Sequence, residues 1–180
     1  MKKLIMFVAC AMLAAYTQAA TVGWSMAGAN AIAGSKYMFF VEGQNGAASV
    51  ATITALLDAG TDVSSYAFGS GTIAATGLGT VAAGASGKTL DAGTYTGFFV
   101  LFDSATLTAN ETKYAVVAGA ASLTKTIGPT TASVTFGAGS VAGVAGNTAN
   151  WATYGAIPEP TSGLLMLVGL GALALRRRRA

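Results

Sequence analysis

Tyr95-Thr96-Gly97-Phe98-Phe99-Val100-Leu101-Phe102 is the segment that most constrains the fold. Aromatic and β-branched residues favour a strand, and successive side chains of a strand point to opposite faces. Phe98, Val100 and Phe102 would lie on one face, and Phe99 and Leu101 on the other. Because both faces are apolar, the sequence predicts a strand that is buried on both sides and therefore central in its sheet.

Shorter segments of similar character lie on both sides of this strand. Residues 36–42 (KYMFFVE) read as a strand, and Asn45-Gly46 directly after them is a hairpin-type turn signal. Further short strands are predicted at 21–26, 66–70, 114–118, 122–126 and 132–136, with Gly128-Pro129 as the turn between the last two. Short strands joined by turn signals predict a mainly β fold, a small β-sandwich-like domain.

One short helix is predicted within this β-rich domain. Val50, Ile53, Leu56 and Leu57 fall at helical spacing, with Ser49 as N-cap and a glycine just past the end. The β-branched residues of the same stretch favour a strand instead, so both alternatives stay open. The small, polar residues 137–150 are predicted to form a loop that leads to Trp151 and Tyr154.

The charge of the chain differs between its ends and its middle. The full 180 residues carry a formal charge of +3, but six of the ten basic residues lie near the two termini. Residues 20–156 hold four lysines and six acids, without arginine or histidine. Nucleic-acid binding requires a clustered basic surface, so this class of partner is excluded. The single cysteine, Cys10, lies near the N-terminus, and no disulfide is expected in residues 20–156.

Motifs that would indicate catalysis or a cofactor are weak. The pattern GxGxxA occurs four times, once within the apolar C-terminal run, so it reflects composition rather than a dinucleotide site. Without histidine, Ser-His catalysis and the usual zinc sites are not expected. The pairs Asp58 with Asp62 and Asp91 with Asp103 leave a carboxylate hydrolase as a minor alternative. We therefore expect no enzymatic activity, no metal and no cofactor.

Threonines recur in Thr-x-Thr pairs at 52/54, 94/96, 106/108 and 124/126. Arrayed threonines can form a flat ligand-binding face. The intervals between these pairs are unequal, however, whereas a solenoid requires one fixed period. A functional threonine array is therefore not expected.

The N-terminus has the three parts of a secretory signal peptide, predicted to cover residues 1–19. Lys2 and Lys3 form the basic region, residues 4–15 the apolar region, and Thr17 and Ala19 fit the small-residue rule for signal peptidase. Cleavage is expected after Ala19, following passage through the Sec translocon. The mature domain would then be residues 20–156.

The C-terminus, residues 157–180, also has three parts. Pro158-Glu159-Pro160 is held extended and outside any helix by its prolines. The apolar run 164–175 would span about 18 Å as a helix, which is short for a hydrocarbon core of about 30 Å. Arg176, Arg177, Arg178 and Arg179 favour the cytoplasmic side, which leaves the proline tripeptide on the opposite side of the membrane.

This tail closely resembles the PEP-CTERM sorting signal of Gram-negative bacteria. The resemblance implies that an exosortase, a membrane-embedded cysteine transpeptidase, recognises Pro158, Glu159 and Pro160 and removes the tail. It further implies that residues 164–175 are a transient transmembrane anchor and that the four arginines are its membrane stop. The precursor would reside in the inner membrane, and the product at the outer surface or in the extracellular matrix, often together with extracellular polysaccharide.

Three functions are therefore compatible with the sequence. The leading hypothesis is an exported structural protein of the cell surface or matrix. The alternative is a module that binds a glycan or a surface protein through exposed aromatics such as Trp24, Trp151 or Tyr154, although the same residues could pack in the core. The carboxylate hydrolase is the third.

Overall fold

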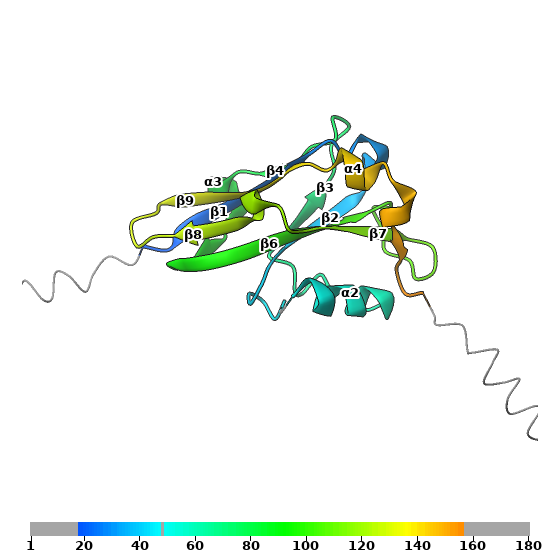
Figure 1. Cartoon of the computed structure of the whole chain (residues 1–180), viewed down its shortest axis with the longest axis horizontal. Coiled ribbons are helices and arrows are strands. Elements are labelled where there is room, and N and C mark those ends of the chain that lie inside the picture. Colours follow the sequence, from blue (N-terminus) through cyan, green and yellow to red (C-terminus); the bar gives the residue numbers. More distant parts are fainter. Residues whose placement is uncertain (1–17, 48, 157–180) are drawn as a thin grey trace, which may run out of the picture.

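The computed structural model describes residues 18–47 and 49–156, which form two β-sheets and few helices (Figure 1). The mainly β prediction is therefore confirmed. The predicted signal peptide up to Thr17, and the predicted transmembrane helix with the rest of the tail from residue 157, lie outside the described residues.

The first sheet is built around the N-terminal strand β1 (Ala20–Ala27). Strands β4 (Gly79–Val81) and β5 (Thr89–Leu90) pair with β1 in antiparallel orientation. Strand β9 (Ser133–Ser140) pairs with β1 in parallel, with Thr21 opposite Ser133. The first strand of the domain is thus flanked by strands from distant parts of the chain.

The second sheet is antiparallel, and its central strand is β6 (Gly93–Phe102). Its order is β10 (Ala152–Thr153), β7 (Lys113–Val117), β6, β2 (Lys36–Val41) and β3 (Gly69–Thr72). Strand β8 (Thr124–Ile127) continues beside the N-terminal part of β6, where Thr94 lies opposite Thr126. The central position predicted for this strand is confirmed.

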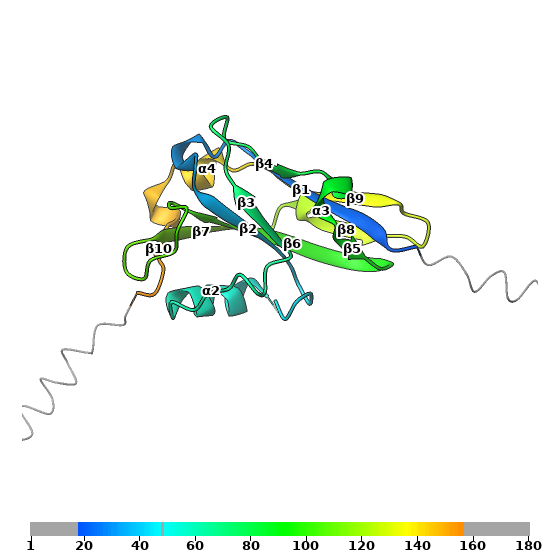
Figure 2. The ribbon, with the colours of Figure 1, turned by 180° about the vertical axis from the view of Figure 1, so that it is seen from behind.

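Helices are short and lie outside the sheets. The longest is α2 (Val50–Asp58), which covers one face of the second sheet (Figures 1 and 2). The others are α3 (Ala83–Ser86), α4 (Ala142–Ala145) and the 3-10 turns η1 (Asn30–Ile32), η2 (Ala121–Leu123) and η3 (Thr148–Asn150).

The second sheet has an apolar core on each of its faces. Between the two sheets lie Trp24, Phe39, Phe99, Leu101 and Phe136 with their neighbours. Between the second sheet and α2 lie Met38, Phe40, Ile53, Leu57, Phe98, Val100 and Phe102. The side chains of β6 therefore divide between two cores in the predicted alternation, and the molecule has three layers: sheet, sheet and helix.

The helical alternative is confirmed for residues 50–58. The side chain of Ser49 accepts a hydrogen bond from the Thr52 backbone N–H at 3.2 Å, which caps the first turn. Ile53 and Leu57, four residues apart, are fully buried against the sheet. The gain from burying one helical face exceeds the modest helix penalty of the β-branched residues.

Two sequence predictions are wrong in position or type. Residues 137–150 are not a loop, because β9 runs on to Ser140 and is followed by α4 and η3. The strand predicted at 66–70 lies later, at Gly69–Thr72. Both segments are rich in Gly, Ala and Ser, which carry no hydrophobic periodicity, and their pairing partners are distant in sequence.

Candidate functional site

The candidate site is the end of the folded domain from which the C-terminal tail departs. Ala156 is the last described residue, so the predicted recognition residues Pro158, Glu159 and Pro160 and the predicted membrane stop at 176–179 lie outside the described residues. Of the predicted signal peptidase residues, Thr17 also lies outside, and Ala19 directly precedes β1. The two described ends of the chain lie at opposite ends of the molecule (Figure 1).

The last residues of the domain are held by backbone hydrogen bonds at the edge of the second sheet. In β10, Ala152 lies opposite Tyr114 and Thr153 opposite Lys113. The Tyr154 N–H donates to the Thr112 carbonyl at 2.8 Å, and the Asn110 N–H donates to the Tyr154 carbonyl at 2.8 Å. We call residues 152–155, with these contacts, the tail clamp.

Tyr154 anchors the tail clamp in the core beneath α2. Its side chain is buried, and its hydroxyl donates to the carbonyl of Gly60 at 2.8 Å. Burial raises the pKa of the Tyr154 phenol, and the nearby Asp62 carboxylate raises it further. The phenol therefore stays protonated and remains a hydrogen-bond donor to the chain just after α2.

Gly155 forms the closest contact of the tail clamp. Its N–H donates to the Leu57 carbonyl, near the end of α2, at 2.8 Å, and its φ is +64°. A Cβ at this position would lie 2.8 Å from the Ala109 Cβ and 3.1 Å from the Gly60 Cα. Only glycine accommodates both the left-handed backbone and this approach.

Tyr114 links the sheet to the same end of α2. Its hydroxyl donates to an Asp58 carboxylate oxygen at 2.6 Å. Burial raises the pKa of Tyr114, and the hydrogen bond to the Asp58 carboxylate adds to the effect. The end of α2 is thereby attached both to β7 and to the tail clamp.

In one predicted carboxylate pair the two acids bind different partners, and in the other they lie far apart. Asp58 is bound by Tyr114, whereas Asp62 accepts hydrogen bonds from the Ser64 hydroxyl at 2.6 Å and its N–H at 2.8 Å. These hydrogen bonds lower the pKa of Asp62. Asp91 and Asp103 lie beyond opposite ends of the ten-residue strand β6, which spans about 30 Å at about 3.3 Å per residue. That separation exceeds what paired acids in a hydrolase require.

The aromatics predicted for glycan stacking are largely enclosed. Trp24 is 3% exposed and Tyr154 is 6% exposed. The Trp24 indole N–H donates to the Tyr37 hydroxyl at 3.2 Å inside the core between the sheets. Trp151 is partly buried and donates to the Ala145 carbonyl. For Trp24 and Tyr154 the core-packing alternative therefore holds, and the alternative of an exposed binding aromatic does not.

The structure does bring together two of the Thr-x-Thr pairs. Thr94 lies opposite Thr126 and Thr96 opposite Thr124, with hydroxyl–hydroxyl distances of 3.1 and 3.5 Å. The unequal intervals in the sequence concealed this arrangement, because strand pairing rather than a fixed repeat aligns the residues.

Within residues 18–47 and 49–156, no group of three or more His, Cys, Asp or Glu side chains is placed to hold a metal ion. In the same ranges, no helix combines the length and apolar character needed to cross a bilayer.

The tail clamp itself was not predicted from the sequence. The sequence offers Tyr154 only as a binding or core aromatic, and the contact between Gly155 and Gly60 joins positions far apart in the chain. The available signal was local: an aromatic-glycine pair, Tyr154-Gly155, stands immediately before the proline-containing tail. Such a pair is consistent with an anchored chain end, but nothing in the sequence shows its partner.

Comparison with known proteins concerns the tail that leaves this clamp. No curated protein and no solved structure matches the chain. A family model does match residues 156–179, directly after Gly155. The C-terminal tail of this chain is therefore a PEP-CTERM protein-sorting motif, which implies export, membrane-anchored sorting and an exosortase as processing partner.

Proposed function

We propose that this protein is an exported, non-catalytic structural domain of the cell surface or extracellular matrix, delivered there by exosortase. One observation carries the proposal: the sorting motif begins at residue 156, immediately after the last residue of the tail clamp. The folded domain and its sorting signal are thus adjacent, without a linker between them. The domain is the cargo, and the tail determines where it goes.

The internal packing of the domain supports a structural role. Its aromatic residues are used mainly to build two cores, and Phe40 stacks on Phe98 with ring centroids 5.0 Å apart. Asp58, Asp62 and Asp103 accept hydrogen bonds from neighbouring groups. Each of the three carboxylates therefore stabilises the local structure through a hydrogen bond.

The proposed route has three steps. The Sec translocon and signal peptidase act on residues 1–19, with Thr17 and Ala19 as the cleavage determinants. The membrane then holds the precursor through residues 164–175 and the four terminal arginines. Exosortase finally reads Pro158, Glu159 and Pro160, and the product joins the outer surface or a matrix that contains extracellular polysaccharide.

Replacement of the proline tripeptide tests this route. In cells that contain the exosortase, the variant Pro158→Ala/Glu159→Ala/Pro160→Ala should insert normally, because the apolar run and arginines are unchanged. Processing should stop, and full-length precursor should accumulate in the inner membrane, as measured by intact mass. Removal of Arg176, Arg177, Arg178 and Arg179 is the control, which should instead weaken retention. A surface form of the native protein that still carries residues 164–179 would show a permanent anchor and contradict the proposal.

A glycan-binding role is the second candidate, and the paired threonines favour it. Thr94, Thr124 and Thr126 are exposed, and the Glu42 backbone N–H donates to the Thr96 carbonyl, so Glu42 is the neighbour of Thr96 on the adjacent strand. Glycan hydroxyls pair well with such groups. Binding of an extracellular polysaccharide by the native chain, lost in Thr94→Val/Thr126→Val, would support this role. If the native chain does not bind the polysaccharide, this second role is rejected and only the structural role remains.

A further inference from the structure

The sorting motif lies very close to the folded domain. Gly155 is hydrogen-bonded to Leu57, and Pro158 is the third residue after it. An extended chain advances at most about 3.6 Å per residue, so Pro158 lies no more than about 11 Å from the clamped backbone. An enzyme that binds Pro158-Glu159-Pro160 must therefore meet the surface of the domain, unless the tail clamp opens first.

Several contacts hold the tail clamp against the domain. Over residues 152–155 it combines strand pairing with β7, the buried Tyr154 side chain and the hydrogen bonds to Thr112, Gly60 and Leu57. Its hydrogen bonds lie against buried side chains of α2 and the second sheet. A segment with this many enclosed contacts opens less readily than a free chain end.

The surface around the tail clamp is acidic. Four of the six acids in residues 20–156 lie there and are exposed: Asp58, Asp62, Asp103 and Glu111. Asp58 is bound to Tyr114, Asp62 lies near Tyr154, Asp103 binds the Lys113 N–H, and Glu111 follows Asn110. We call these four acids the tail-exit face. Two lysines lie in the same region: Lys113 is opposite Thr153 of the tail clamp, and Lys36 is near Asp62. They balance two of its four negative charges.

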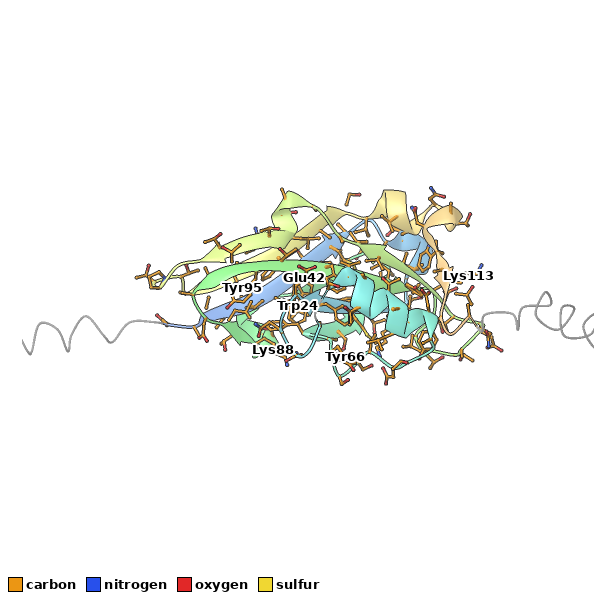
Figure 3. The ribbon with its side chains drawn as sticks, turned by 60° about the horizontal axis from the view of Figure 1, so that its bottom comes forward. Trp24, Glu42, Tyr66, Lys88, Tyr95 and Lys113 are labelled. Atoms are coloured by element: carbon orange, nitrogen blue, oxygen red, sulfur yellow. The ribbon has the colours of Figure 1, made fainter. Side chains whose placement is uncertain are left out.

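The other two acids lie elsewhere. Glu42 follows β2 and bonds the Thr96 carbonyl, and Asp91 precedes β6. Figure 3 shows Glu42 near the middle of the molecule and Lys113, which pairs with the tail clamp, at one end. The acidic residues are thus concentrated at the end from which the sorting motif emerges.

We propose that the tail-exit face is a docking surface for the exosortase, which takes the folded domain with its tail clamp closed and presents a basic surface to these acids. This inference rests on the proposed function. We choose the exosortase as the partner because its recognition sequence starts only three residues after Gly155, at the same end of the domain as these acids. A bilayer with anionic lipids would repel a face of this charge.

A disulfide across the tail clamp tests whether it stays closed. Because the Tyr154 N–H bonds the Thr112 carbonyl, Thr153 and Lys113 form a non-hydrogen-bonded pair, whose Cα atoms lie about 4.5 Å apart. This geometry suits a disulfide. Thr153→Cys/Lys113→Cys locks β10 on β7, and each single cysteine variant is a control. Equal precursor half-lives for the locked and single variants are expected. A locked precursor that is processed only after reduction would show that the clamp must open, and would overturn the proposal.

Charge variants test the tail-exit face itself. Asp62→Asn/Glu111→Gln removes two charges there while leaving an acceptor for Ser64, and Glu42→Gln/Asp91→Asn removes two charges elsewhere. In pulse-chase experiments on the full chain with exosortase, the first pair should lengthen the precursor half-life about threefold or more, because surface charges chiefly set encounter rates. The second pair should match the native chain. Equal half-lives for both pairs would refute docking through this face. Thermal unfolding shows whether both variants are folded.

The outcomes separate this inference from the proposed function. If the native precursor is processed only when Pro158-Glu159-Pro160 is intact, the proposed function holds. Docking on a closed clamp is then supported if the disulfide leaves the precursor half-life unchanged and Asp62→Asn/Glu111→Gln lengthens it. If the tripeptide variant is processed like the native chain, the proposed function itself fails. If the first charge pair instead increases binding of the full chain to anionic vesicles without changing processing, the face governs membrane approach and not the enzyme.

Discussion

The two ends of the described chain are attached to the domain in different ways. At the N-terminal end, β1 has eight residues, and Val22, Trp24 and Met26 point into the core between the sheets. It pairs with three other strands. At the C-terminal end, β10 has two residues and pairs with β7 alone. One end is part of the core, and the other is fastened to an edge.

This difference indicates how each end can be processed without harm to the fold. Cleavage after Ala19 leaves β1 intact, whereas removal of residues from β1 itself would disturb the strand pairing that holds the first sheet together. Removal of residues beyond Gly155 would leave the strand pairing and the buried Tyr154 in place. A sorting signal placed after an edge attachment can therefore be removed from a finished domain.

The largest expected effect comes from breaking the N-terminal attachment. Trp24→Ala should lower the free energy of unfolding by about 3 to 5 kcal/mol, because it leaves a cavity in the core between the sheets. Trp24 stacks on Phe39 with centroids 5.4 Å apart. Denaturant unfolding of the domain provides the measurement. Trp151→Ala is the matched control, with a smaller loss because Trp151 is only partly buried. Equal losses would contradict the comparison of the two ends.

A smaller, local effect should follow from breaking the C-terminal attachment. Gly155→Ala places a Cβ 2.8 Å from Ala109 at a φ of +64° and should cost about 1 to 3 kcal/mol. Hydrogen exchange should accelerate at Tyr154 and Gly155 while β1 keeps its protection. Gly139→Ala is the control, since Gly139 has the same φ with nothing within 4 Å of the added Cβ. Loss of protection throughout β1 would show that the ends are not independent.

The phenol–carboxylate contact near the C-terminal end should make the domain sensitive to alkali. The pKa of Tyr114 is raised above its ordinary value of 10.0, so the folded state keeps a proton that the unfolded state loses. The stability from this group is complete below about pH 10 and falls as the pH rises further. Tyr114→Phe should cost about 1 to 2 kcal/mol at pH 7 and should flatten the alkaline decline. Unfolding curves from pH 7 to 11 measure both. If the free energy of unfolding of Tyr114→Phe falls with pH as steeply as that of the native protein, Tyr114 is not the cause of the alkaline decline.

The smallest effect concerns a single hydroxyl of the tail clamp. Tyr154→Phe keeps the buried ring but removes the hydrogen bond to the Gly60 carbonyl. A loss of about 1 kcal/mol is expected, the usual net value for a neutral hydrogen bond. Denaturant unfolding gives this value, and Tyr66→Phe is the control at a partly buried tyrosine packed on the same core. A loss as large as that of Trp24→Ala would mean that the edge attachment matters as much as the core strand.

Features that depend on local residues were predictable from the sequence. The apolar residues on both faces of 98–102 identified the central strand, and β6 divides its side chains between two cores as expected. Ser49 and the spacing of Ile53 and Leu57 indicated the helix α2, although the β-branched residues of the same stretch left a strand open. Both signals lie within a few residues of each other, so they survive in a single sequence.

Features that join distant residues were not predictable. The parallel pairing of β1 with β9 and the approach of Gly155 to Gly60 leave no periodic trace in the sequence. Residues 137–140 continue β9 although they are Gly, Ala and Ser, because the neighbouring strand supplies the hydrogen bonds. For the sorting tail the situation is reversed: its three-part pattern is local, and the family match at residues 156–179 confirms it.

The parallel pairing of β1 has a consequence for the order of folding. The Thr21 hydroxyl bonds the carbonyl of Ala132, 111 residues later in the chain. Chains are made from the N-terminus, so the first strand to emerge must wait until most of the polypeptide exists before its parallel partner arrives. Closing so long a loop is slow. Until then one hydrogen-bonding edge of β1 lacks its partner strand, and an unpaired strand edge is prone to aggregation.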